Sequence, residues 1–201
     1  MIPESVGKIV LYRTNRKDPV MAKIVNSTFI SLDGVVNHME KWHFDYLGEQ
    51  SDQLAMAQLE DAGALLMGRN TYQVYADAWP SRDGEYADRI NALPKYVASS
   101  TLRDPTWHGT QVLTGDLLDE VAKLKQNEGG SILMHGVGPV AKTLLRNDLL
   151  DELHLWVHPV LAGVGDKNDM LFEAGLHAKL ETSNVQAFDN GIVVLSFRRP
   201  S

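Results

Sequence analysis

Cysteine is absent from the chain: none occurs among its 201 residues. This absence excludes disulfides, cysteine-ligated zinc, iron–sulfur clusters and a thiol nucleophile. It is also compatible with a cytoplasmic protein. Any binding or catalytic chemistry must therefore come from histidines, carboxylates, hydroxyls, basic side chains or backbone amides.

Long hydrophobic runs are missing as well. The first twenty residues are interrupted by Arg13, Arg16, Lys17 and Asp18, so no secretory signal sequence is predicted there. No other stretch reaches the length of a membrane span. We therefore expect a soluble, cytoplasmic protein without a membrane partner.

An excess of positive charge is the third missing feature. The formal net charge is -7, and a protein that neutralises nucleic-acid phosphates needs a basic face, so no nucleic-acid partner is predicted. An acidic total still allows a local basic pocket for a small anionic ligand. Hydrophobic residues make up 44% and charged residues 22%, which is typical of a packed domain rather than a disordered chain.

Strand-like and helix-like segments alternate from Met21 onward, without an internal repeat or a charged linker. We expect residues 1–20 to be an N-terminal extension, with a short strand from Lys8 to Tyr12, and residues 21–201 to form one domain. Strands are predicted at 23–31, 64–67, 95–99, 111–114, 131–134 and 153–158. Helices are predicted at 51–62, at 70–78, after Pro139, and through 117–124 with an end at Gly129-Gly130.

The end of the chain has a different pattern. Two further strand-like runs, 178–188 and 192–197, flank the turn sequence Asp189-Asn190-Gly191, which is a hairpin signal. Alternation followed by a hairpin predicts an α/β fold with three layers, α/β/α. Its sheet is mixed and mostly parallel, with a C-terminal antiparallel hairpin and helices on both faces.

Three polar or glycine-rich clusters follow predicted strands, where open α/β sheets bind ligands. In the first, Gly68 ends a strand and a helix begins at once, with Arg69 and Thr71 in its first turn. Free amides at a helix start and an arginine both suit phosphate. Taken alone, the segment also fits an ordinary turn with a solvated arginine.

The second cluster is the hydroxyl run Ser99, Ser100 and Thr101, which could bond an anion or simply cap a turn. The third is a glycine turn that opens a helix at Pro139. Its glycines would let the backbone approach a ligand closely, although such a turn needs no ligand. The residues of this third cluster are His135, Gly136, Val137 and Gly138.

Together, these clusters resemble the dihydrofolate reductase-like superfamily. Within it, the chain is most similar to stand-alone proteins of the RibD C-terminal domain family, named for a riboflavin-biosynthesis reductase. The similarity extends over nearly all of the chain from Met21 onward. The segments that carry it are Ser31 to Val35, Leu66 to Tyr72, His135-Gly136 with Leu144-Leu145, Leu149 to Leu161, Gly163, Gly165 and Leu171-Phe172.

The resemblance implies an NADPH-dependent oxidoreductase that transfers a hydride to a C=N bond of a small pterin- or pyrimidine-like heterocycle. Dihydrofolate reductase and 5-amino-6-(5-phosphoribosylamino)uracil reductase are the corresponding activities. It implies that Arg69, with Ser99, Ser100 and Thr101, faces the adenosine 2′-phosphate. It also implies that Gly68, Thr71, His135, Gly136, Val137 and Gly138 lie along the rest of the cofactor.

For the substrate side, the resemblance implies that Asp33 borders the reacting ring as a catalytic and substrate-binding residue. Trp42 would be a wall of the substrate pocket, although both residues also fit plain structural roles. The chain departs from the dihydrofolate reductases because His135 replaces the first glycine of a Gly-Gly pair. No carboxylate in 34–39 matches the pterin-binding one, which argues against folate as the substrate.

His154, Trp156 and His158 alternate with apolar residues, so we expect them on the non-core face of one strand. Two histidines four apart on a strand lie more than about 10 Å apart, which argues against a metal pair and for a chain without a metal site. Trp156 there suggests burial under a helix or contact with a second copy in a homodimer.

Three functional hypotheses remain open at this point. The first is the NADPH-dependent reductase, for which a deazaflavin or flavin in place of NADPH is not excluded. The second is a non-catalytic protein that binds a nucleotide, pterin or flavin on the same fold. The third is a structural homodimer built on the Trp156 face.

Overall fold

The structure of the chain is a computed structural model that describes residues 21–127, 129–171 and 174–200. The expected extension 1–20 and its short strand from Lys8 to Tyr12 lie outside the described residues.

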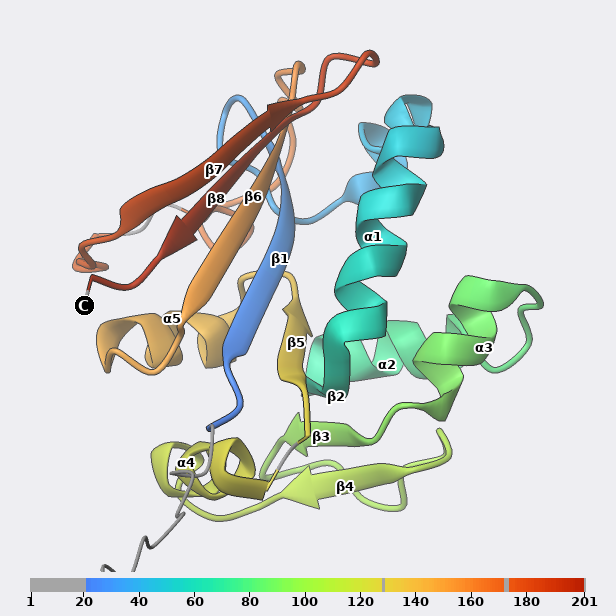
Figure 1. Ribbon diagram of the computed structural model, residues 1–201, viewed down its shortest axis with the longest axis vertical. Helices are drawn as coiled ribbons and strands as arrows, with labels where there is room; N and C mark the ends of the chain where they lie inside the picture. Colours follow the sequence, from blue (N-terminus) through green and yellow to red (C-terminus); the bar gives the residue numbers. More distant parts are fainter. Residues whose placement is uncertain (1–20, 128, 172–173, 201) are drawn as a thin grey trace, which may run out of the picture.

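An eight-stranded sheet runs through the molecule in the order β4-β3-β2-β5-β1-β6-β8-β7 (Figure 1). The strands from β4 to β6 in this order are all parallel to their neighbours, whereas β8 runs antiparallel to β6 and β7 antiparallel to β8. The predicted mixed, mostly parallel sheet with a C-terminal antiparallel hairpin is confirmed. The strands are β1 Ile24–Ser31, β2 Ala62–Gly68, β3 Lys95–Ala98, β4 Thr110–Leu113, β5 Ser131–His135, β6 Glu152–His158, β7 Glu181–Ala187 and β8 Val193–Arg198.

Helices cover both faces of this sheet and complete the three layers (Figure 1). Helices α1, α2 and α3 pack on one face, and α4 and α5 pack on the other. The helices are α1 Glu49–Asp61, α2 Arg69–Ala78, α3 Glu85–Ala92, α4 Leu117–Asn127 and α5 Pro139–Arg146. Among the residues described, no helix is long and apolar enough to cross a bilayer.

The strand β5 explains why the central strands are apolar without alternation. Its consecutive residues Ile132 and Leu133 are both buried, but in different clusters on opposite faces of the sheet. A strand with a helical layer on each side has no solvent face, so its sequence shows no polar/apolar period.

The helix α3 and two short 3-10 helices, Met39–Lys41 and Phe44–Tyr46, were not predicted. In α3 the buried residues are Ala87 and Ile90, and the remaining positions are mostly polar. So short an element with so narrow an apolar face gives little helical periodicity in the sequence. The 3-10 helices bury none of their residues, so they leave no periodic signal at all.

The expectation that Trp156 and His158 face away from the core is wrong. Trp156 is 1% exposed and His158 is fully buried. The Trp156 indole packs against Phe188 and donates a hydrogen bond to Ser27 Oγ at 2.9 Å. Residues of α1 help to close this cluster, so of the two alternatives, burial is the correct one. A homodimer cannot be built on Trp156.

Candidate functional site

The three predicted clusters come together at the carboxyl edge of the parallel strands. Gly68, the last residue of β2, pairs with Ala98, the last residue of β3, so the run that begins at Ser99 lies directly beside it. On its other side β2 pairs with β5, which ends at His135. The parallel topology therefore gathers residues from three distant segments, as expected for open α/β sheets.

Two helix starts adjoin each other at this edge. The N-cap residues Gly68 of α2 and Gly138 of α5 are extended, and neither helix start has a side-chain cap. A Cβ placed on Gly68 would lie 3.4 Å from Val140 Cγ2 in the first turn of α5. The uncapped amides of the first turns are therefore available to an anion at neighbouring positions.

An open pocket of about 270 Å³ lies between the start of α5 and the loops that follow β3 and β4. This volume is slightly below the roughly 300–1,000 Å³ of small-ligand pockets, which suits one nucleotide half of a larger cofactor. The residues that line it are Ala98, Ser99, Ser100, Leu113, Thr114, Gly115, Leu117, Pro139, Val140 and Thr143.

Arg69 extends from the first turn of α2 toward the loop after β3. Its Nη1 donates a hydrogen bond to Thr101 Oγ1 at 2.8 Å, and both side chains are exposed. The loop is itself fixed by Ser99 Oγ, which accepts from the amides of Thr101 and Leu102 at 3.2 and 2.9 Å. A guanidinium and hydroxyls thus share one surface beside the pocket, which suits a phosphate. Thr71 is the third residue of the same helix.

The glycine turn after β5 leaves its backbone open. A Cβ added at Gly136 or at Gly138 would meet no atom within 4 Å, and Gly136 has a φ of +76°. The Gly136 carbonyl accepts a hydrogen bond from Asn26 Nδ2 at 2.8 Å, and Asn26 is fully buried in β1. Asn26 is therefore a positioning residue of the turn. Sequence reasoning missed it, because the β-branched and aromatic residues of β1 are what predict the strand.

The side chains of His135 and Val137 turn away from the open surface of the turn. Val137 is buried in the core on the α5 side. His135 Nδ1 shares a 2.9 Å hydrogen bond with the Tyr75 hydroxyl on the α2 side. Burial raises the pKa of Tyr75 and lowers the pKa of His135 to about 4, so both groups are neutral at pH 7. The predicted contact of His135 and Val137 with a cofactor would therefore use their backbone atoms.

A neutral, partly buried His135 predicts acid sensitivity. Its pKa in the folded chain is about 4, below the ordinary 6.5, so the unfolded chain takes up a proton first as the pH falls. This contribution to stability is present above pH 6.5 and is lost between 6.5 and 4. By pH 5 the loss reaches up to about 2 kcal/mol.

Urea unfolding at pH 7 and pH 5 measures this loss. In His135→Gln the fall in unfolding free energy between the two pH values should be up to about 2 kcal/mol smaller than in the wild type. The exposed His177, changed to Gln, is the matched control and should keep the wild-type fall. Equal falls in wild type and His135→Gln would contradict the prediction.

The Asp33 carboxylate is bonded within the turn that follows β1. Its carboxylate accepts hydrogen bonds from Ser31 Oγ at 2.5 Å and from the amides of Ala162 and Gly163 at 2.9 and 2.8 Å. The Ser31 hydroxyl and these amides lower its pKa to about 2. Asp33 thus ties the end of β1 to the loop after β6. A role beside the reacting ring stays a prediction, but this carboxylate is poorly suited to donating a proton.

Trp42 lies in a group of rings between β1 and the 3-10 segment. It is 4% exposed, and its indole N–H donates to the Asn37 carbonyl at 2.8 Å. Its ring meets that of His158 edge-on, with centroids 5.1 Å apart. Trp42 therefore has a packing role, and its predicted position as a wall of the substrate pocket stays a prediction.

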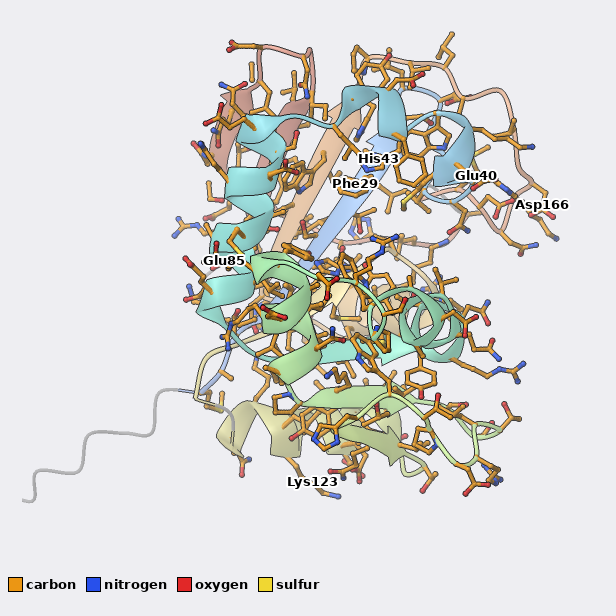
Figure 2. All side chains as sticks on the ribbon, turned by 90° about the vertical axis from the view of Figure 1, so that its right-hand side faces the viewer. Phe29, Glu40, His43, Glu85, Lys123 and Asp166 are labelled. Atoms are coloured by element: carbon orange, nitrogen blue, oxygen red, sulfur yellow. The ribbon has the colours of Figure 1, made fainter. Side chains whose placement is uncertain are left out.

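The sequence reasoning missed a histidine pair in the same group. His43 Nδ1 and His158 Nε2 are 2.9 Å apart in a buried hydrogen bond, and the Phe29 ring stacks on His43 at 4.1 Å. Figure 2 labels Phe29 and His43, which lie close together on one side of β1. The only sequence signal was a segment with Trp42, His43, Phe44 and Tyr46 in a chain of 7% aromatic residues.

His154 does not join that pair. His154 Nδ1 and Ser196 Oγ are 2.8 Å apart, whereas His158 Nδ1 contacts the Trp156 carbonyl. Their strand spacing predicted this separation. Within the described ranges, no group of three or more histidines and carboxylates is arranged to hold a metal ion.

Comparisons with known proteins identify the family and agree with the fold. The model of the RibD C-terminal domain matches residues 22–194. The uncharacterized protein YyaP of Bacillus subtilis (strain 168) is 23% identical over 180 residues, which cover 87% of this chain and 94% of that protein.

Solved structures give the same result. A Shewanella sp. PV-4 structure named for riboflavin biosynthesis is 25% identical, with a TM-score of 0.70, covering 90% of this chain and all of that one. A Thermotoga maritima diaminohydroxyphosphoribosylaminopyrimidine deaminase/5-amino-6-(5-phosphoribosylamino)uracil reductase is 13% identical, with a TM-score of 0.62, over 90% of this chain and 57% of that one. The second likeness concerns the fold alone.

Proposed function

Because the chain belongs to the RibD C-terminal domain family, a family of reductase domains, we propose that it is an NADPH-dependent reductase of a small heterocycle. In this proposal the substrate is pterin- or pyrimidine-like and receives a hydride at a C=N bond. The protein acts on a small molecule, without nucleic acid or membrane, and functions as a homodimer through a surface other than Trp156.

The observation that carries the proposal is the pair of uncapped helix starts at Gly68 and Gly138, beside the hydroxyl loop and Arg69. Two sets of free amides suit a diphosphate, and a guanidinium beside hydroxyls suits a third phosphate. The open backbone at Gly136 leaves room for the ring that follows. The residues present therefore fit a phosphorylated dinucleotide.

The cofactor, when bound, would supply the hydride, and the chain's residues would hold it. Arg69, Ser99, Ser100 and Thr101 would bind the 2′-phosphate, and the starts of α2 and α5 the diphosphate. A flavin or deazaflavin has no adenosine 2′-phosphate, so it would lack the group that Arg69 is proposed to bind. This difference makes Arg69 the residue that separates the cofactors.

Arg69→Ala should weaken NADPH binding about 10- to 100-fold and leave NADH binding within about twofold of the wild type. A charge-assisted hydrogen bond contributes roughly 1.5–3 kcal/mol, and only NADPH carries the phosphate that receives it. Dissociation constants from protein or nicotinamide fluorescence measure both affinities.

The matched control is Arg198→Ala, which removes an exposed arginine that is paired with Glu181 at the other end of the sheet. It should bind both cofactors as the wild type does. Equal wild-type affinities for NADPH and NADH, unchanged in Arg69→Ala, would contradict the proposal. Tight NADPH binding without cofactor oxidation across a panel of heterocycles would favour the second candidate, a non-catalytic binding protein. That candidate is supported by the Asp33 carboxylate, which already accepts hydrogen bonds from two backbone amides.

A further inference from the structure

The reaction proposed above needs side chains that hold the substrate ring beside the cofactor. Among the described residues, the candidates near the carboxyl edge are few. The Asp33 carboxylate accepts three hydrogen bonds, and His135 is bonded to Tyr75 beneath α2. The pair formed by His43 and His158 is not used by any step described so far.

The hydrogen bonds of this pair fix where its protons lie. His158 Nδ1 is 2.8 Å from the Trp156 carbonyl oxygen, which can only accept, so Nδ1 carries a proton. In neutral His158 the other nitrogen, Nε2, is then an acceptor. It lies 2.9 Å from His43 Nδ1, which must donate to it. The remaining nitrogen, His43 Nε2, therefore presents a lone pair.

His43 as a whole is only 6% exposed, but its Nε2 is not fully enclosed. No partner for it occurs in the described part of the chain, where no enclosed side-chain nitrogen or oxygen lacks a hydrogen bond. Because His43 Nε2 has no partner there, it must be accessible from outside the rings that surround the pair. His158, in contrast, is fully buried behind His43. One nitrogen of the pair is thus open to a ligand, and the other three are held by the protein or by each other.

The groups around the pair are mostly apolar rings. Phe29 of β1 stacks on His43, and Trp42 and Phe44 contact its edges. The ring centroids of Tyr46 and His158 are 5.4 Å apart. Among the described residues, Tyr46 is the one other titratable side chain with a ring contact to the pair. Burial lowers the pKa of His43 to about 4, with a smaller contribution from His158, and burial also lowers the pKa of His158.

The pair lies near the predicted position of the reacting ring. Ser27 of β1 pairs with His135, the residue before Gly136, and Phe29 follows two residues later on the same face of β1. Ser27 and Phe29 are therefore roughly 7 Å apart along β1, and β1 and β5 are about 4.8 Å apart. A substrate ring beside a nicotinamide at Gly136 would therefore lie on the side of β1 where Phe29 stacks on His43.

We propose that the lone pair of His43 Nε2 accepts a hydrogen bond from an N–H group of the substrate ring, and that His158 is a positioning residue that aims this lone pair at the ring. The inference rests on the proposed reductase function. The neutral pair would thereby hold the ring with its C=N carbon facing the nicotinamide.

The first test reads the proton positions directly. Long-range ¹H–¹⁵N spectra of the full chain should give the Nδ1–H tautomer for both His43 and His158. His158→Leu removes the acceptor and should release His43 to the Nε2–H tautomer that is usual for a free imidazole. His158→Gln, which keeps an acceptor oxygen, should retain Nδ1–H. An Nε2–H tautomer for His43 in the wild type would overturn the inference.

The second test uses pterin (2-amino-4-oxopteridine) as the probe, with NADP⁺ present. Its binding should move the ¹⁵Nε2 resonance of His43 and leave that of the exposed His177 unchanged. His43→Leu should weaken pterin binding about tenfold or more, as expected for roughly 1.4 kcal/mol. His43→Gln should recover part of this loss, and both variants should bind NADP⁺ within about twofold of the wild type.

The outcomes separate this inference from the proposed function. If NADP⁺ and pterin bind but the His43 resonance stays in place, or if His43→Leu binds pterin as the wild type does, only the role of His43 is overturned. If NADP⁺ binds and pterin does not, the pterin-type substrate and this assignment fail together. If NADP⁺ does not bind, the reductase proposal fails and the inference falls with it.

Discussion

Gly130→Ala is expected to destabilise the fold by about 3 kcal/mol or more, because the new Cβ would collide with backbone atoms. It would lie 2.7 Å from the Asp61 carbonyl oxygen and 2.7 Å from the Gly63 amide nitrogen. Neither backbone can move freely, because Gly63 falls at a register shift between β2 and β5 in the middle of the sheet.

The neighbouring glycine provides a matched control. A Cβ added at Gly129 meets nothing within 4 Å, so Gly129→Ala should change the unfolding free energy by less than about 0.5 kcal/mol. Urea unfolding of the two variants and the wild type measures the difference. Equal stability of Gly129→Ala and Gly130→Ala would mean that the close approach of β2 and the start of β5 does not constrain the fold.

This glycine pair also illustrates how far sequence reasoning reached. The sequence predicted that a helix ends at Gly129-Gly130, and α4 does end just before them. It could not predict that Gly130 alone is required by a contact with Gly63, because that contact joins segments more than sixty residues apart. Local signals such as turns and helix stops are in the sequence, whereas close backbone approaches arise only from the packed chain.

The same distinction holds for the layers and the strands. Apolar runs predicted β2, β3 and β5, and the Asp189-Asn190-Gly191 turn predicted the hairpin of β7 and β8. The period-two pattern of β6 was interpreted as one core face and one outward face. The structure buries both residues on the second face: α1 and the end of the hairpin cover Trp156, and the segment with the two 3-10 helices covers His158. Alternation identifies two faces, but it does not tell which of them is solvated.

The candidate site was predictable where it consists of backbone. Gly68 and Gly138 were identified as helix starts after strands, and the parallel order of β2, β3 and β5 brings their loops together. The side-chain partners were not predictable in this way. The bond between His43 and His158 joins residues 115 positions apart, and no spacing rule connects them.

Gly138→Asp should separate stability from cofactor binding at the start of α5. Gly138 is the N-cap, its φ of -89° is open to any residue, and a Cβ there meets nothing within 4 Å. Aspartate is a favoured N-cap that accepts the free amides and suits the positive end of the helix, so the fold should gain about 0.5–1.5 kcal/mol. The same carboxylate would occupy the position proposed for the diphosphate.

NADPH binding to Gly138→Asp should therefore fall by 100-fold or more, since placing like charges together costs several kcal/mol, roughly tenfold for each 1.4 kcal/mol. Gly138→Asn is the matched control, because it has nearly the same shape and also caps a helix but carries no charge. It should keep NADPH binding within about tenfold of the wild type. Thermal unfolding and fluorescence titration of the three proteins give both quantities. An aspartate variant that binds NADPH as tightly as the asparagine variant would mean that no cofactor phosphate approaches the start of α5.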